Sequence, residues 1–184
     1  METQELHSWR TYADPFSAVV AHTTNWDAAT PCMEWTARDV VEHVVLTQRD
    51  FLGQHRLLPA GAAGIEPGRE RPDRLWKTHE QLVAALLSDA AVAGREFGGY
   101  FGPSTIGATI AGFYGVDLLT HRWDLAVSQG LDPLLTRQDL DAIDAAMDGF
   151  GEQAYAAGLF ARPVEVSDGA DRTASVLART GRRA

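Results

Sequence analysis

Residues 115–124 read GVDLLTHRWD and place three polar side chains within an apolar stretch. An α-helix brings positions i, i+4 and i+7 onto one face, and Asp117, His121 and Asp124 have this spacing. They would share a stripe with Phe113, which we expect to face the core. Buried polar groups need partners, so the pattern predicts an internal polar site on a long helix.

The composition predicts one globular domain, residues 1–184. The chain has 184 residues, 45% of them hydrophobic, and a formal net charge of −9. That is enough for a single packed core. The acidic balance argues against a nucleic-acid partner, since phosphate-binding surfaces are rich in Lys and Arg. We interpret the basic cluster near the end of the chain as solvated: Arg179, Arg182 and Arg183.

The sequence indicates a cytoplasmic protein with no membrane partner. No run approaches the roughly 20 apolar residues that span a bilayer, and the N-terminus lacks the pattern of a signal peptide. The only cysteine is Cys32, which excludes an intramolecular disulfide. Its place ahead of a predicted helix would favour a thiolate, but it has no sequence neighbour to activate it. We therefore interpret it as a small buried side chain.

Helical spacing of apolar residues recurs along the chain. It predicts an all-α bundle of four long helices, with additional short helices and an extended C-terminal tail. The first helix is predicted to begin at Asp14-Pro15, with an N-cap and a proline at the first helical position, and to stop at Thr30-Pro31. Residues 36–39 fit a capping box, which opens a second helix to about Leu58.

The remaining elements are bounded by caps, glycine or proline. An irregular connection over residues 59–72 leads to a third helix capped by Asp73, and a turn or hairpin follows over residues 94–102. The next helix is predicted from Pro103-Ser104 to Gly130. A further helix opens with the capping box at residues 136–139 and ends near Gly158, and residues 160–184 form an extended segment with a short helix.

Polar groups on two of these helices predict a metal site. His43 lies on the inward stripe of the second helix, as Asp117 and His121 do on the later one. Two imidazoles and a carboxylate that converge in a bundle suit a divalent transition metal, with zinc favoured and nickel or iron as options. A cation would also relieve the cost of burying a lone carboxylate, on the order of several kcal/mol. Asp124 could hydrogen-bond a ligating imidazole.

Each of these residues also has a purely structural interpretation. His43 could bond a carbonyl group in the core, and Asp117 could cap a turn locally. Asp124 could pair with Arg38. A D-x-x-x-H pattern alone is weak, but two inward histidines and a carboxylate on separate apolar stripes favour the metal site.

Other polar and aromatic residues carry weaker signals. Arg122 flanks the site, and we interpret it as solvated rather than as a contact for an anionic substrate. Glu42 points about 100° away from His43 around the helix and should not join the same site. Trp35 is interpreted as core or pocket lining. Three histidines are interpreted as surface or connector residues: His22, His55 and His79.

At these residues the sequence resembles the DinB-like superfamily, specifically the mycothiol-dependent maleylpyruvate isomerase type of metal-binding domain. The resemblance is carried by TPCMEWTARDVVEHVV (residues 30–45), DLLTHRWDLA (117–126) followed by Gly130, and a tail pattern that runs from Phe160 through PVEV to Gly181-Arg182. It covers nearly the whole chain. It implies a four-helix bundle that holds a divalent metal.

Carried over, the first and last metal ligands fall on His43 and His121. The middle ligand falls on Asp117, where relatives more often have Glu or His. An aspartate reaches about one methylene less far, so it is expected to bind a metal through water or to leave the site weak.

The resemblance implies activation of a low-molecular-weight thiol, such as mycothiol, toward a small-molecule electrophile. The isomerase that names the family has an additional C-terminal domain, so we expect S-transfer or a related thiol-dependent step rather than maleylpyruvate isomerisation. The alternative is a non-catalytic metal-binding or small-ligand-binding bundle, with homodimerisation through an outer helix face as an option.

Overall fold

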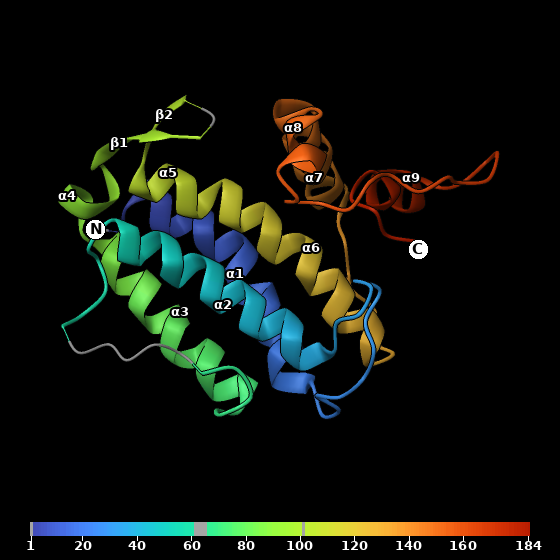
Figure 1. The fold of residues 1–184 in the computed structure, drawn as a ribbon, viewed down its shortest axis with the longest axis horizontal. Helices are drawn as coiled ribbons and strands as arrows, with labels where there is room; N and C mark the ends of the chain where they lie inside the picture. The colour runs from blue at the N-terminus through green and yellow to red at the C-terminus, as the bar shows by residue number, and fades with distance from the viewer. Residues whose placement is uncertain (1, 61–65, 101) are drawn as a thin grey trace.

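The computed structural model describes residues 2–60, 66–100 and 102–184, and it is largely helical (Figure 1). Four long helices form a bundle: α1 (Gln4–His22), α2 (Ala37–Gln54), α3 (Pro72–Ser88) and α6 (Phe113–Ser128). Helices α1 and α2 each pack against both α3 and α6. The predicted all-α bundle is therefore confirmed, with α2 and α6 as neighbours.

Short elements connect α3 to α6 at one end of the bundle (Figure 1). These are α4 (Ala90–Ala93), the strands β1 (Glu96–Gly99) and β2 (Gly102–Thr105), and α5 (Ile106–Ala111). The strands form an antiparallel hairpin in which Phe97 pairs with Ser104. The prediction of a turn or hairpin is thus confirmed as a hairpin. Residues 61–65 of the predicted irregular connection, and residue 101, lie outside the described residues.

Helices α7 (Arg137–Phe150), α8 (Gln153–Ala156) and α9 (Arg172–Arg179) lie beside the bundle (Figure 1). A second hydrophobic cluster joins Leu119 and Trp123 of α6 to Ile143 of α7 and Leu177 of α9. The main cluster covers the opposite side of α6, through residues such as Leu118. Because α6 packs on both sides, four consecutive or nearly consecutive polar residues along it are buried: Thr120, His121, Arg122 and Asp124.

The first helix begins at Gln4, not at Asp14 as predicted. Thr3 is the N-cap, and its side chain accepts a hydrogen bond from the Leu6 amide. Pro15 lies inside the helix, where a proline normally costs about 3 kcal/mol. Burial of Trp9 and Phe16 on either side of it opposes that cost.

The helix predicted from Pro103-Ser104 to Gly130 begins only at Ile106, because Gly102–Thr105 form β2, and it is divided at Gly112 into α5 and α6. A Cβ at Gly112 would lie 2.9 Å from the carbonyl oxygen of Ala108. Gly115 has a different role, because a Cβ there would lie 2.6 Å from the Tyr12 ring. Its missing side chain lets α6 approach α1 closely.

Two other helices are shorter than predicted. The second ends at Gln54 rather than near Leu58. Helix α7 ends at Phe150, because Gly151 adopts a positive φ of 54°, and the separate α8 follows before Gly158.

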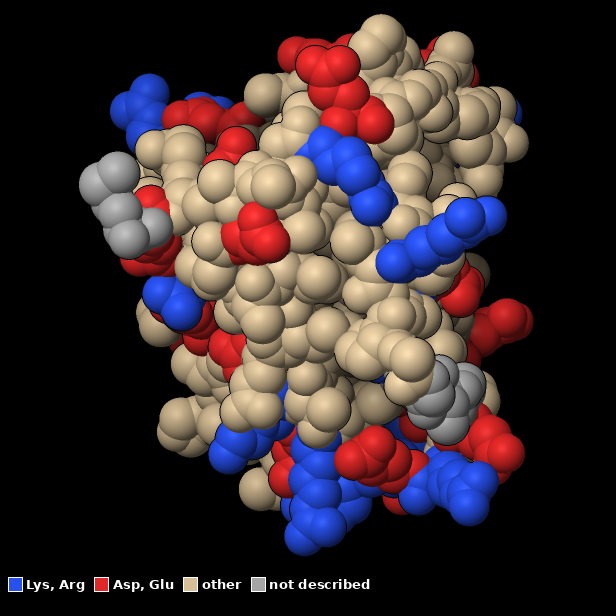
Figure 2. All heavy atoms as spheres, turned by 90° about the vertical axis from the view of Figure 1, so that its left-hand side faces the viewer, with Lys and Arg blue, Asp and Glu red and all other residues tan. Residues whose placement is uncertain are grey.

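Charged side chains of both signs are interspersed on the face shown in Figure 2, around a broad area of uncharged residues. No large patch of a single sign covers this face. Within the part of the chain that the structure describes, every helix is too short or too polar to cross a bilayer.

Candidate metal centre

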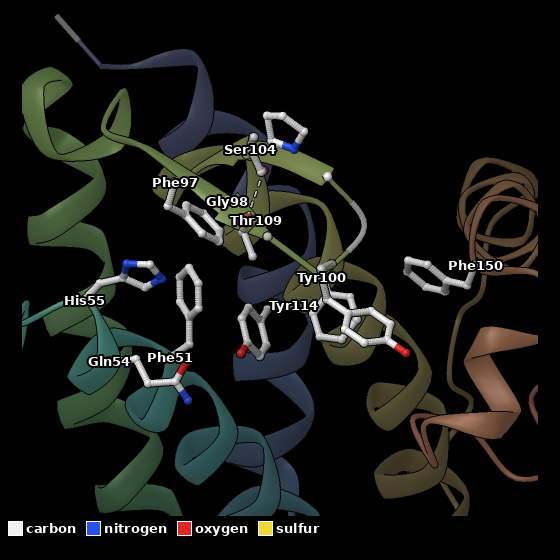
Figure 3. A pocket seen from close by; sticks show the side chains of 15 residues that line it. Phe51, Gln54, His55, Phe97, Gly98, Tyr100, Ser104, Thr109, Tyr114 and Phe150 are labelled. Carbon is white, nitrogen blue, oxygen red and sulfur yellow. Dashed lines mark hydrogen bonds between the residues drawn. The ribbon is translucent and has the colours of Figure 1, made fainter.

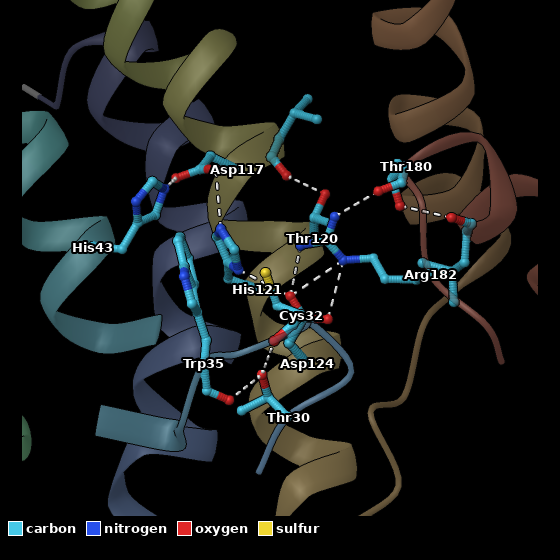
Figure 4. Close-up of polar contacts among 12 residues, drawn as sticks. Thr30, Cys32, Trp35, His43, Asp117, Thr120, His121, Asp124, Thr180 and Arg182 are labelled. Carbon is cyan, nitrogen blue, oxygen red and sulfur yellow. Dashed lines mark hydrogen bonds and ion pairs between the residues drawn. The ribbon is translucent and has the colours of Figure 1, made fainter. Parts of the chain in front are cut away.

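Helices α2 and α6 bring together His43 and Asp117, which are half-buried, and His121, which is buried (Figure 4). One ligand atom from each residue lies within 4.8 Å of the other two. His121 Nε2 is 3.3 Å from Asp117 Oδ1, and His43 Nε2 is 3.8 Å from Asp117 Oδ2. The three residues singled out from the sequence therefore meet at one point.

The Asp117 carboxylate fits a cation better than it fits its present neighbours. Its Oδ2 atom is buried and has no hydrogen-bond partner among the described residues. A buried acceptor without a donor costs about 1–3 kcal/mol, and more when it is charged. Two imidazole nitrogens and one carboxylate, at a position that leaves room for another ligand, form a donor set typical of zinc and related metals. The residues present thus fit a divalent transition metal.

The charges in the site favour an ionised Asp117 beside a protonated His121. Burial alone would raise the pKa of the Asp117 carboxyl, but His121 and His43 outweigh it and hold that pKa well below its usual range. Burial would lower the pKa of His121, but Asp117 and Asp124 outweigh it and raise the pKa to about 9. A cation would take the place of the His121 proton as the partner of Asp117.

Asp124 and Arg182 support the far side of the His121 ring. His121 Nδ1 lies 2.9 Å from Asp124 Oδ2, which leaves Nε2 facing Asp117. Arg182 Nε donates to Asp124 Oδ1 at 3.0 Å, and its Nη2 donates to Oδ2 at 2.7 Å. Asp124 is 0% exposed and Arg182 only 6% exposed, so this ion pair is closed to solvent. The end of the chain therefore fixes the orientation of a candidate ligand.

The prediction of a solvated basic cluster is wrong for two of its three arginines. Arg182 is buried against Asp124, as described above. Arg179 forms ion pairs with Asp144 and Asp148 of α7. Only Arg183 is exposed. The reason is that α9 packs on α7 and carries the following residues back to α6.

The predictions for Arg122 and His79 are also wrong. Arg122 is buried, and its Nη2 donates to Asp139 Oδ2 at 2.8 Å, because α7 covers this side of α6. His79 is buried between α3 and α2, with Nε2 3.1 Å from Gln48 Oε1.

The other residues weighed from the sequence do not belong to the group of three candidate ligands. His22 is exposed and His55 is half-buried. Glu42 accepts a hydrogen bond from the Gly68 amide at 2.8 Å. Cys32 is half-buried, and burial raises its pKa to about 11, so its thiol is protonated at neutral pH.

Trp35 forms a wall of the site. Its ring centroid lies 4.6 Å from that of His43 and 5.6 Å from that of His121, in a stacked arrangement with the latter. The two imidazoles are 5.1 Å apart between centroids. Trp35 therefore limits rotation of both rings from the loop that precedes α2 (Figure 4).

A cavity of about 300 Å³ opens beside His43 and Asp117. Its other lining residues are mostly apolar: Thr47, Phe113, Tyr114, Phe150, Gly158, Leu159 and Phe160. This cavity, called here the inner cavity, gives a small ligand access to the point where the candidate ligands meet.

Residues 9–126 match the family model described as mycothiol maleylpyruvate isomerase N-terminal domain. The match includes all three candidate ligands and Asp124. Two uncharacterised proteins of Mycobacterium tuberculosis, from strains CDC 1551 / Oshkosh and ATCC 25618 / H37Rv, are each 34% identical to the chain over 140 residues. That alignment covers 72% of this chain and 73% of each relative. No solved structure gives a significant match.

Proposed function

Because the chain belongs to the mycothiol maleylpyruvate isomerase N-terminal domain family, which is DinB-like and metal-binding, we propose that it is a metal-dependent enzyme. It uses a small thiol, of the mycothiol type, to attack an electrophilic carbon in S-transfer or isomerisation. One observation carries the proposal: ligand atoms of His43, Asp117 and His121 lie within 4.8 Å of one another, and the first two residues line a cavity.

Zinc suits the donor set best, and nickel or iron would also fit. His43, Asp117 and His121 would hold a divalent cation, which would supply a Lewis acid able to lower the pKa of a thiol. Asp117 contributes a full negative charge, because its pKa is depressed. Asp124, held by Arg182, keeps His121 Nε2 directed at the same point. The rings of Phe113 and Phe160 line the inner cavity and give it apolar walls beside His43 and Asp117.

A non-catalytic role in binding a metal or small ligand is the second candidate, and one feature of the inner cavity favours it. Apart from His43 and Asp117, the only titratable group among its described lining residues is Tyr114. Burial raises the pKa of the Tyr114 hydroxyl, which donates a hydrogen bond to the Thr47 carbonyl oxygen. The cavity thus offers little for proton transfer besides the candidate ligands.

Metal content tests the first part of the proposal. Protein purified without a histidine tag and reconstituted with Zn²⁺ should hold one equivalent, measured by elemental analysis. His43→Ala should hold less than about a tenth of an equivalent, because two donors bind zinc weakly. The matched control is His22→Ala, which removes an exposed histidine of α1 and should keep the full equivalent. A wild-type protein that stays metal-free after reconstitution would contradict the proposal.

Thiol consumption separates an enzyme from a binding protein. The zinc-loaded wild type should accelerate conjugation of a small thiol to a model electrophile, and His43→Ala should reduce the rate to background. The His22→Ala control should match the wild type. Equal rates for the wild type and His43→Ala would instead support the binding role.

A further inference from the structure

A larger cavity, of about 670 Å³, lies between the hairpin and α2, α5 and α6 (Figure 3). It adjoins the inner cavity, because Phe113, Tyr114 and Phe150 line both. We call it the outer chamber. Its own lining includes Phe51, Gln54, His55, Phe97, Ser104 and Thr109. A molecule in the outer chamber would therefore lie next to the inner cavity, which His43 and Asp117 line.

Aromatic rings form a continuous row along the outer chamber. Phe51 lies 5.5 Å from Phe97 and 5.5 Å from Tyr114, measured between ring centroids. Phe113 continues the row at 5.0 Å from Tyr114 and 5.6 Å from Phe150. These spacings are those of interacting aromatic pairs, and a flat ring could join the row in the same way.

The polar groups of the outer chamber are uncharged. Ser104 Oγ and Thr109 Oγ1 are hydrogen-bonded to each other at 3.0 Å. Burial, and then the charge of Arg95, lower the pKa of His55, so its ring is neutral at neutral pH. No Asp, Glu, Lys or Arg is among the residues described as lining the chamber. An anion in the chamber would lose hydration, and no cationic side chain among the described lining residues would offset that loss.

We propose that the outer chamber binds the electrophile, and that the electrophile is an uncharged aromatic molecule rather than a carboxylate anion. This inference rests on the function proposed above and names its substrate class. The volume lies within the range of small-molecule sites, roughly 300–1,000 Å³. Like such sites, the chamber combines apolar walls with few polar groups.

An aromatic α,β-unsaturated ester illustrates the chemistry. The sulfur lone pair of the deprotonated thiol forms a C–S bond at the β-carbon, and the π-electron pair of the double bond moves to the α-carbon. The α-carbon then takes a proton from water. The proton that the thiol released to solvent replaces the one taken from water, so the overall reaction adds the thiol across the double bond. No oxidant or leaving group is needed.

Binding of a matched pair of ligands tests the charge preference. Methyl cinnamate and the cinnamate anion have nearly the same shape and differ in charge. Calorimetric or NMR titration of the zinc-loaded full chain should show the ester binding at least about tenfold tighter. The same preference is expected for metal-free His43→Ala, because the outer-chamber residues do not include His43. Equal binding of the two ligands, or tighter binding of cinnamate, would overturn the inference.

A lysine substitution at the rim of the outer chamber tests whether the ligands bind there. Gln54 is exposed on the chamber rim, so Gln54→Lys adds a cation there at little packing cost. It should tighten cinnamate binding about fivefold and leave ester binding unchanged. The control, Gln81→Lys on the exposed side of α3, makes the same change in net charge and should have no effect. If the two lysine variants behave alike, the outer chamber is not the site.

Phe97→Ala removes one ring of the row and should weaken ester binding at least about fivefold. A turnover assay with the ester and a thiol then separates this inference from the proposed function. Ester binding without thiol-dependent consumption would overturn the function and leave the chamber as a ligand site. If the ester is consumed but Phe97→Ala does not raise its KM, the inference is overturned and the proposed function stands.

Discussion

Two histidines are buried to a similar depth in this protein, yet their surroundings favour opposite charge states. His121 is 4% exposed and His79 is 1% exposed. The ring of His121 lies between Asp117 and Asp124, and its pKa is raised to about 9. The ring of His79 faces the Gln48 amide, and burial lowers its pKa to about 3. Acidic partners, rather than depth, therefore distinguish the histidine that is suited to a cation site.

The polar atoms without hydrogen-bond partners at the two sites also indicate that the His121 site, and not the His79 site, suits a cation. Near His79, the ring Nδ1 and the Gln48 Nε2 lack partners among the described residues. A neutral acceptor and a neutral donor suit a buried water molecule. Near His121, the atom without a partner is a carboxylate oxygen of Asp117. An anionic oxygen beside imidazoles suits a cation.

Removing the support behind His121 should give the largest effect on stability. Arg182→Met replaces the buried guanidinium with an apolar chain of similar length and leaves Asp124 buried without its cation. The free energy of unfolding should fall by about 3–5 kcal/mol in urea denaturation. Arg183→Met, at the exposed neighbouring position, should change it by less than about 0.5 kcal/mol. A loss below about 1 kcal/mol for Arg182→Met would mean that the pair adds little to the site.

Replacing each buried histidine with an amide should separate the two sites by metal affinity. His121→Asn keeps a hydrogen-bond donor toward Asp124 but removes the Nε2 atom that faces Asp117. Zn²⁺ affinity, measured by competition with a chelator, should fall at least about 100-fold. His79→Gln keeps a donor toward Gln48 and should change affinity by less than about twofold. Equal losses in the two variants would remove the distinction between the sites.

The two sites should also respond oppositely to pH. For His79 the folded pKa of about 3 lies below the unfolded value of 6.5. As the pH falls below 6.5, the unfolded state gains a proton that the folded state does not, so stability is lost at about 1.4 kcal/mol per pH unit. For His121 the raised pKa gives a contribution that is complete below 6.5 and lost as the pH rises through about 9.

Urea denaturation of the metal-free protein at pH 5 and pH 7 measures the His79 contribution. The wild type should lose roughly 2 kcal/mol more than His79→Gln between these values. Carboxylates titrate in both proteins, so their contribution cancels in the comparison. Identical pH dependence in the wild type and the variant would show that His79 does not resist protonation.

Local sequence signals predicted the helices more reliably than their ends. Both capping boxes form as expected, Thr36 with Asp39 and Thr136 with Asp139, because each requires residues only three positions apart. The start of α1 was missed because Asp14-Pro15 is a good local helix start. Helix α1 continues through Pro15 because Trp9, earlier in the helix, is buried in the core, and no short pattern reveals that.

In the candidate site, too, contacts within one helix could be predicted from the sequence, whereas contacts between distant segments could not. Asp117 and His121 are one helical turn apart, so the sequence alone places them on one face. Arg182 lies 58 positions from Asp124, and no spacing rule connects them. The burial of Arg122 depends likewise on α7, through Asp139. Contacts that require one helix to cover another could not be predicted from the local sequence.

The smallest expected effect concerns the reach of Asp117. Its Oδ2 atom lies 3.8 Å from His43 Nε2, whereas its Oδ1 lies 3.3 Å from His121 Nε2. Asp117→Glu adds one methylene on the side of the inner cavity and brings a carboxylate oxygen closer to His43. Zn²⁺ affinity should rise about tenfold, because all three donors can then approach one ion at about 2 Å.

The control for Asp117→Glu is Asp117→Asn, which keeps the shorter length but removes the charge and should weaken Zn²⁺ binding at least about tenfold. Opposite changes in the two variants would show that reach, as well as charge, limits the wild-type site. His79 would be unaffected in both, since its partner Gln48 lies on a different part of α2. If Asp117→Glu instead weakens binding, the shorter aspartate is the better fit, and the distances would have to close by movement of His43.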